Sequence, residues 1–222
     1  FTVNGCDHSI EAFLEHSGFE VISKWAMGST PDELKMAGKA HVNLVISATG
    51  LGVAKALYEM FGTPYVIGLP YDKEASERLS KLLHRAVSEE HAKDQASFVE
   101  WSCLPGEEIA IVGEGITSLA LANAIELTIK KGVKVLCATE CEDGILREKD
   151  RMTMDEEEIE EALSGVKYMI ADPLYRPICP EGTEFIPLPV EAFSGRIFRD
   201  EIPNLAGTFD SWIACKQYAN LV

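Results

Sequence analysis

The chain has 222 residues, 46% of them hydrophobic, which is enough to bury one large core or two smaller ones. Its formal net charge of −16 produces a surface that repels phosphate backbones, so we expect no nucleic-acid partner. No apolar run approaches the roughly 20 residues of a membrane-spanning helix and no signal peptide is recognisable, so we expect a cytoplasmic protein with no membrane partner. The chain opens without Met inside an apparent strand, and we therefore expect a fragment of a longer protein.

The first half of the chain alternates strands with helices. The pattern predicts strands at 2–4, 20–23, 42–46 and 65–67 and helices at 10–16, 51–61 and 72–93. Thr30-Pro31-Asp32-Glu33 predicts a further helix that begins at a capping box. This alternation is typical of a parallel sheet with helices on both faces.

Small residues and hydroxyls follow the predicted strand at 42–46. Ser47, Ala48, Thr49 and Gly50 stand where the next helix must begin close to the backbone. In open α/β sheets, ligands bind beyond the carboxyl ends of the strands. We therefore predict that Ser47, Thr49 and Gly50 lie at the mouth of a crevice.

A second unit follows a boundary near residues 94–107. The pattern predicts strands at 108–112, 134–138, 168–171 and 184–188, and helices at 117–131, 155–163 and 208–221. Gly132 is expected to cap the helix at 117–131. The predicted fold class is α/β, with two Rossmann-like domains at residues 1–97 and 98–222, each a parallel sheet flanked by helices.

Gly113-Glu114-Gly115 lies between a strand and a helix, where a dinucleotide fingerprint would lie. Ser118 stands in place of the third glycine, and the Glu114 carboxylate would repel a pyrophosphate. We favour a tight strand-to-helix turn over NAD binding. An NAD-binding protein is kept as a third alternative, which NADH titration would test and for which we expect no binding.

Two loops beyond strands carry an arginine. Arg176 follows Asp172-Pro173, and Arg196 follows Ser194-Gly195, and either guanidinium suits a carboxylate or phosphate. The structural interpretation, in which each arginine ties loop carbonyls or pairs with the excess acids, is favoured over a binding role. The acidic run at 155–161 is interpreted as the solvated face of a helix.

The six cysteines include no C-x-x-C pair, and we expect free thiols in a reducing compartment. Cys137 is expected to be a small core residue within a strand. Cys141 follows that strand, where a ligand role stays open. The histidines show no metal-ligand spacing, so no metal site is expected on this chain.

In its order of motifs, the chain resembles the component-1 family of nitrogenase-type oxidoreductases. The motifs that carry the resemblance are Gly18–Trp25, Lys39-Ala40 with Val42–Val45, Phe61–Tyr65, Gly68–Pro70, Ile111–Glu114, Ala171–Tyr175 and Ala192–Arg196. The family includes nitrogenase subunits, cofactor-assembly scaffolds and dark-operative protochlorophyllide reductase. The resemblance implies a nitrogenase molybdenum-iron protein-like fold of three Rossmann-like domains, of which this chain would cover the second and third.

The resemblance also implies partners and cofactors. Such subunits form homodimers or heterodimers with a homologous subunit and receive electrons from an ATP-dependent iron–sulfur protein. Their iron–sulfur cluster is held by cysteines of the first domain, which would lie upstream of Phe1. We therefore expect an iron–sulfur cluster on the full-length protein but no cofactor on this fragment.

Two positions depart from the family pattern. The strand that ends in a cofactor-binding cysteine in nitrogenase ends here in Ser47, whose alcohol is a poor ligand for iron. The position of the histidine ligand falls near Pro189, which has no ligand atom. Dinitrogen is therefore not the expected substrate.

The leading hypothesis is a cytoplasmic, anaerobic nitrogenase-like reductase that acts on a small molecule or a tetrapyrrole-type substrate. The resemblance places the substrate or cofactor between domains, and the predicted lining residues are Ser47, Thr49, Gly50, Glu114, Arg176 and Arg196. The catalytic residues are not assigned. The alternative is a non-catalytic scaffold or carrier of a metal cluster for another enzyme.

Overall fold

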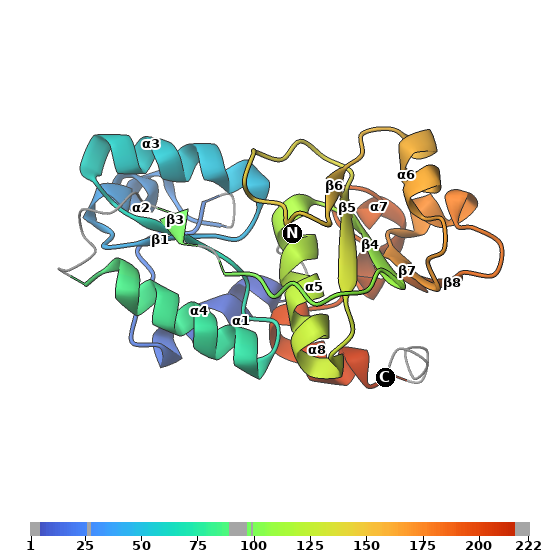
Figure 1. The fold of residues 1–222 in the computed structure, drawn as a ribbon. Coiled ribbons are helices and arrows are strands. Elements are labelled where there is room, and N and C mark those ends of the chain that lie inside the picture. The colour runs from blue at the N-terminus through green and yellow to red at the C-terminus, as the bar shows by residue number, and fades with distance from the viewer. Residues whose placement is uncertain (1–4, 26–27, 89–96, 99, 216–222) are drawn as a thin grey trace.

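The computed structural model describes residues 5–25, 28–88, 97–98 and 100–215 as two parallel sheets side by side, with helices around them (Figure 1). The predicted strand at 2–4, the end of the helix at 72–93 and the end of the helix at 208–221 lie outside these residues. The predicted class, α/β with parallel sheets flanked by helices, is confirmed. The boundary between residues 97 and 98 stays a prediction.

The first sheet has the order β1-β2-β3, with all strands parallel. Its strands are β1 (Asn43–Val45), β2 (Tyr65–Ile67) and β3 (Ser97–Phe98). The helices of this half are α1 (Cys6–His16), α2 (Pro31–Lys35), the 3-10 helix η2 (Ala37–Lys39), α3 (Leu51–Phe61) and α4 (Lys73–Ala86). Helices α3 and α4 lie on opposite sides of the sheet (Figure 1).

The second sheet has the order β6-β5-β4-β7-β8, again all parallel. Its strands are β4 (Ile109–Gly113), β5 (Val133–Cys137), β6 (Arg151–Met152), β7 (Tyr168–Ala171) and β8 (Glu184–Pro187). The surrounding helices are α5 (Gly115–Ile129), α6 (Glu156–Ala162), the 3-10 helix η4 (Pro173–Ile178), α7 (Gly195–Phe198), the 3-10 helix η5 (Arg199–Glu201) and α8 (Leu205–Ile213).

Successive side chains of β4 point to opposite faces of the second sheet, and each face packs against its own layer of helices. Ile109 and Ile111 pack in one cluster with the apolar residues of α5, whereas Ala110 and Val112 pack in another with Ile159 of α6. Because successive strand residues face opposite sides of a sheet, α5 and α6 cover opposite faces. All five residues of β4 are buried, which explains the continuous apolar run in the sequence.

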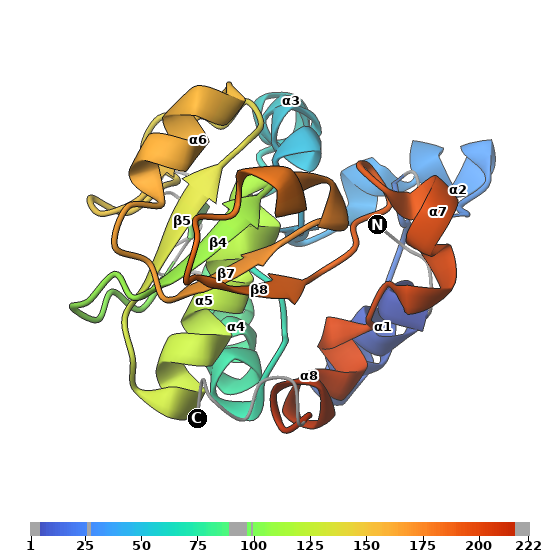
Figure 2. The ribbon, with the colours of Figure 1, turned by 90° about the vertical axis from the view of Figure 1, so that its right-hand side faces the viewer.

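The two halves share one core. The cluster that contains Ile109 and Ile111 continues through Val45 and Ile67 of the first sheet. Helix α8 returns to pack against α1 (Figure 2). The side-chain amide of Asn204 donates to Ser9 Oγ at 2.8 Å. Burial of apolar surface thus holds both sheets in one body.

A buried cluster of charges secures the connection between the halves. Glu126 of α5 is 0% exposed and forms ion pairs with Arg147 at 3.2 Å and Lys149 at 2.6 Å. Its other carboxylate oxygen accepts hydrogen bonds from the Ser102 hydroxyl and the Leu104 amide of the connecting segment. A buried carboxylate needs such partners, and here they attach the segment to α5.

Several predicted elements are confirmed. The strand at 168–171 is found with its predicted bounds, and the strands at 42–46 and 65–67 are found as β1 and β2. The capping box is confirmed, since Thr30 Oγ1 accepts from the Glu33 amide and Glu33 accepts from the Thr30 amide. No helix of the described residues is long and apolar enough to cross a membrane.

Other predictions are wrong. Residues 20–23 form no strand, because among the described residues no neighbouring strand pairs with them. The cap of α5 is Lys130, which adopts a left-handed conformation with φ of 57°, and not Gly132. Gly132 is instead required by close packing, because a Cβ atom there would lie 2.2 Å from the Pro105 carbonyl oxygen.

Candidate functional site

The loop after β1 begins the candidate site. Ser47 is in an extended conformation, and residues Ala48–Gly50 form a single 3-10 turn (η3) that leads into α3. The Gly50 amide donates to the Ser47 carbonyl at 3.0 Å, and the hydroxyls of Ser47 and Thr49 are 3.1 Å apart. The loop therefore presents a hydrogen-bonded pair of hydroxyls, with Ser47 half-buried and Thr49 exposed.

Glu114 approaches this loop from the other sheet. It is the N-cap of α5, and its carboxylate accepts from the Thr117 amide at 2.9 Å and the Thr117 hydroxyl at 2.8 Å. The same carboxylate accepts from the Ala48 amide at 2.7 Å. A negative charge at a helix N-terminus is stabilised by the helix dipole. The structure thus brings together four of the predicted site residues: Ser47, Thr49, Gly50 and Glu114.

The glycines on either side of Glu114 are explained by packing. A Cβ on Gly113 would lie 2.7 Å from Ser118 Oγ, and one on Gly115 would lie 2.8 Å from Cys141 Sγ. The helix amides that would hold a pyrophosphate already donate to the Glu114 carboxylate. This geometry agrees with the tight turn that we preferred to a dinucleotide fingerprint.

A second contact between the halves lies near the first. Lys55 of α3 forms an ion pair with Glu142, in the loop after β5. The hydrogen bond that the Lys55 ammonium group donates to the Glu142 carboxylate raises the pKa of Lys55. Both side chains are substantially exposed, so this pair contributes little stability by itself. It does place the loop after β5 against α3.

Asp172 organises the loops after β7 and β8. This buried carboxylate caps η4 through the Leu174 amide at 3.0 Å and accepts from the Val190 amide at 2.8 Å and the Ser194 hydroxyl at 2.7 Å. The rings of Tyr175 and Phe193 meet edge-on with centroids 5.9 Å apart. The two arginine-bearing motifs of the sequence are therefore joined, and Asp172 has a structural role in joining them.

The two arginines themselves are exposed. Arg176 lies over the ring of Phe185, 4.6 Å from its centroid, and Arg196 lies in the short helix α7. Among the described residues neither guanidinium has an ion-pair partner, and no hydrogen bond joins either one to Ser47 or Glu114. Their predicted part in the site stays a prediction.

The structure places the thiols of Cys137 and Cys141 at the same edge of the second sheet, whereas the sequence pattern suggested a separate role for each. Cys137 ends β5 and is buried, as predicted, and Cys141 follows four residues later. Burial, the neighbouring Cys137 and the Glu114 charge raise the pKa of the Cys141 thiol to about 12. The signal in the sequence was the four-residue spacing at a strand end, opposite a glycine-bounded turn.

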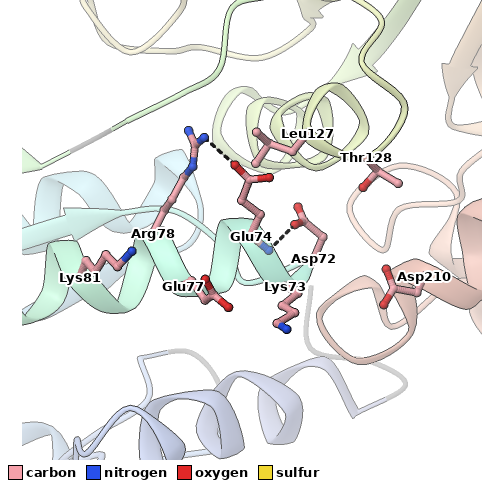
Figure 3. A pocket seen from close by; sticks show the side chains of 9 residues that line it. All are labelled: Asp72, Lys73, Glu74, Glu77, Arg78, Lys81, Leu127, Thr128 and Asp210. Atoms are coloured by element: carbon pink, nitrogen blue, oxygen red, sulfur yellow. Dashed lines mark hydrogen bonds and ion pairs between the residues drawn. The ribbon is translucent and has the colours of Figure 1, made fainter.

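One cavity of about 590 Å³ lies away from this edge, against α4, α5 and α8. Figure 3 shows Asp72 from the start of α4, Thr128 from α5 and Asp210 from α8 around it. Asp72 Oδ2 is buried and has no hydrogen-bond partner among the residues that the structure describes, and burial raises the pKa of this carboxyl group. None of the six predicted site residues lines this cavity.

The residues present do not fit the metal cofactor that the family resemblance implies for nitrogenase. Ser47 offers a hydroxyl that is hydrogen-bonded to Thr49, and the buried Pro189 offers no ligand atom. Within the part of the chain that the structure describes, no group of three or more His, Cys, Asp or Glu side chains is arranged to hold a metal ion.

Comparison with known proteins provides one match. A family described as nitrogenase component 1 type oxidoreductase matches residues 5–172, which include both sheets up to the end of β7 and the contact between Ala48 and Glu114. No curated protein and no solved structure matches the chain.

Proposed function

The chain belongs to the nitrogenase component 1 type oxidoreductase family, and from that membership we propose that it is part of a nitrogenase-like reductase subunit. The subunit takes electrons from an ATP-dependent iron–sulfur protein and pairs with a homologous subunit in the cytoplasm. Its iron–sulfur cluster is held outside these 222 residues. The substrate is a small molecule or a tetrapyrrole, and the enzyme works under anaerobic conditions.

The observation that supports a binding site is the hydrogen bond between the Ala48 amide and Glu114. It sets the carboxyl end of a strand in one parallel sheet against the carboxyl end of a strand in the other. Such edges are where α/β proteins bind their ligands, because loops there are free to vary while the sheets stay rigid.

The residues at this edge suit a polar substrate. The Ser47 and Thr49 hydroxyls are 3.1 Å apart, and the one that accepts in this pair can donate its own proton to a carbonyl or carboxylate of a ligand. Gly50 allows close approach of a ligand to the backbone. Arg176 and Arg196 are exposed on loops of the second sheet and suit carboxylate groups at a substrate's periphery. Glu114 positions the loop and does not itself contact the substrate.

Dinitrogen is not proposed as the substrate. Ser47 and Pro189 stand where the resemblance implies a thiolate and an imidazole, and neither replaces those ligands for soft iron. The same observation favours a second candidate function, a scaffold or carrier for a metal cluster. A carrier must release its cluster, which weak ligands permit.

The experiment uses the full-length protein, purified without oxygen. For a reductase we expect bound iron and sulfide, and ATP-dependent electron transfer from an iron–sulfur reductase protein. A scaffold would transfer a cluster to an acceptor apoprotein and show no ATP-dependent turnover. A protein that is free of iron after anaerobic purification would rule out the reductase.

Variants of the site provide a second test. Ser47→Ala is expected to raise KM several-fold with a smaller change in kcat, because a hydroxyl used in binding is lost. Ser164→Ala, at an exposed serine beyond α6, is the matched control and should leave both constants unchanged. Equal effects of the two variants would count against binding at Ser47.

A further inference from the structure

The thiols of Cys137 and Cys141 occupy one small space. A Cβ atom on Gly115 would lie 3.3 Å from Cys137 Sγ and 2.8 Å from Cys141 Sγ. Both sulfurs therefore border the volume that the missing Gly115 side chain leaves open at the first residue of α5. The Cys137 thiol itself donates to the Thr139 carbonyl at 3.3 Å.

The backbone holds one thiol in the sheet and the other on a loop. Cys137 is fixed by the β5 ladder, and its carbonyl accepts from the Thr153 amide at 2.9 Å. Cys141 lies beyond the strand, in a loop without regular structure. A disulfide requires close approach of the two Cβ atoms, and a loop residue beside a fixed one can adjust to meet that requirement.

From this geometry we propose that Cys137 and Cys141 are a dithiol that peroxide closes to an intramolecular disulfide at the edge of the second sheet. Two S–H bonds break and one S–S bond forms, with loss of two electrons and two protons. A peroxide is the oxidant. Hydrogen peroxide takes up the electrons and protons, its O–O bond breaks, and two molecules of water form.

The local electrostatics support a disulfide over a metal site. Both oxygens of Glu114 already accept hydrogen bonds, so this neighbouring carboxylate is not a free third ligand. Burial, Cys137 and the Glu114 charge outweigh the backbone hydrogen bond at Glu142 and raise the pKa of the Cys141 thiol, so its thiolate is destabilised overall. Dithiols that strongly oxidise other proteins have a stabilised thiolate, so the absence of that stabilisation favours a disulfide that persists once formed.

Closure would act on the contact between the two halves. Glu142 directly follows Cys141 and pairs with Lys55 of α3, and Gly115 directly follows Glu114, which holds Ala48. A disulfide therefore ties the loop that carries Glu142 to the end of β5, beside the segment that carries Glu114. The proposal concerns a modification of this chain's own residues and does not depend on the identity of the substrate.

Peptide mapping tests the proposal directly. Trypsin cleaves after Lys134 and after Arg147, and so releases residues 135–147 as one peptide that contains both cysteines. After treatment with hydrogen peroxide and alkylation of free thiols, we expect this peptide to be unalkylated and lighter by two hydrogens, and to recover two alkylation sites after dithiothreitol. The rate should rise about tenfold for each pH unit below the thiol pKa, since the thiolate reacts.

Variants provide the controls. Cys141→Ser should leave Cys137 open to alkylation at every peroxide concentration, whereas Cys103→Ser, at an exposed cysteine, should form the disulfide as the wild type does. Independent alkylation of both cysteines in oxidised wild-type protein would overturn the proposal. So would oxidation of Cys141 to a sulfinic acid while Cys137 stays reduced. The wild-type measurement decides the matter even if a variant fails to fold.

Discussion

Glu114 Oε1 accepts a hydrogen bond from the Ala48 amide at 2.7 Å, and this contact joins the loop after β1 to the first turn of α5. One carboxylate therefore both caps a helix and connects two parallel sheets. Because the acceptor is charged, the bond is stronger than one between neutral groups. The stability of the candidate site depends on this residue.

Replacement of Glu114 by alanine should cost about 2 to 3 kcal/mol of unfolding free energy, from the lost helix cap and the lost contact with Ala48. Urea denaturation measures the change. Asp155→Ala is the matched control, because Asp155 caps α6 through the Glu158 amide at 2.8 Å and makes no contact with the other sheet. It should cost about 1 kcal/mol. Equal losses would show that the Ala48 contact contributes nothing.

Gly115→Ala should destabilise the protein by about 1 to 3 kcal/mol, because the new methyl group would lie 2.8 Å from Cys141 Sγ. Gly52→Ala in α3 is the control: nothing lies within 4 Å of its Cβ position, so alanine there should stabilise by about 0.5 to 1 kcal/mol. Addition of Cys141→Ala should recover part of the loss in Gly115→Ala. A Gly115→Ala protein as stable as Gly52→Ala would contradict the packing.

Glu126→Gln should cost about 3 kcal/mol near neutral pH, because it leaves Lys149 without its buried partner, whereas Arg147 keeps its pair with Asp150 at 2.7 Å. Burial acts to raise the pKa of Glu126, but hydrogen bonds from Lys149, Ser102 and two backbone amides outweigh it and lower the pKa from 4.5.

The pH dependence of this effect follows from the lowered pKa. The charged Glu126 carboxylate stabilises the fold at a pH above 4.5, which is the pKa of this group in the unfolded chain. This stabilisation is lost as the pH falls through the lower pKa of the folded state. The difference between wild type and Glu126→Gln should therefore shrink in urea titrations below that pH. Glu108→Gln, which removes an exposed pair with Lys167, should change stability by less than about 1 kcal/mol. A pH-independent difference would exclude the charge as its cause.

Asp72→Asn should raise stability near neutral pH by about 1 kcal/mol. Burial first, and then the charges of Glu74 and Asp210, raise the pKa of this carboxyl group (Figure 3). Its Oδ2 atom has no hydrogen-bond partner within the described part of the chain. Because the pKa is higher in the folded state, protonation of Asp72 stabilises the fold, fully so at a pH below 3.8, the pKa in the unfolded chain. This stabilisation is lost as the pH rises through the pKa of the folded state. Asparagine keeps the cap on α4 without the charge.

The gain of Asp72→Asn should therefore disappear on acidification, which thermal or urea unfolding across the acid range would detect. Asp155→Asn provides the comparison, since Asp155 is an exposed cap on α6 for which no such gain is expected. A gain that persisted at acid pH would point to a cause other than the buried charge.

Much of the fold could be predicted from local patterns. The apolar runs that became β1, β2, β4, β5 and β7, the capping box at Thr30 and the left-handed Gly62 at the end of α3 all depend on neighbours within a few residues. The two-residue strands β3 and β6 were not predicted, since so short a pairing leaves no periodic signal. Residues 20–23 have strand-like composition, but within the described part of the chain no strand pairs with them.

The candidate site was predicted only in part. Ser47, Thr49 and Gly50 were found because they follow a buried strand, and Glu114 because it stands between two glycines. Arg176 and Arg196 were predicted to line the same site because each follows a strand of the second sheet. In the structure both are exposed, on separate loops. The roles of Gly115 and Gly132 depend on atoms from distant segments, which no local pattern reveals.

The sequence by itself determined the α/β class, the order of most elements, the acidic surface and the family, because these follow from hydrophobic periodicity, composition and motif order. Only the tertiary structure decided which strand ends meet. Ala48 and Glu114 are 66 positions apart, and their contact depends on how two sheets pack through a shared core. The pairing of Cys137 with Cys141 over Gly115 has the same origin, since the packing of β5 and its loop against α5 sets the distance between the thiols.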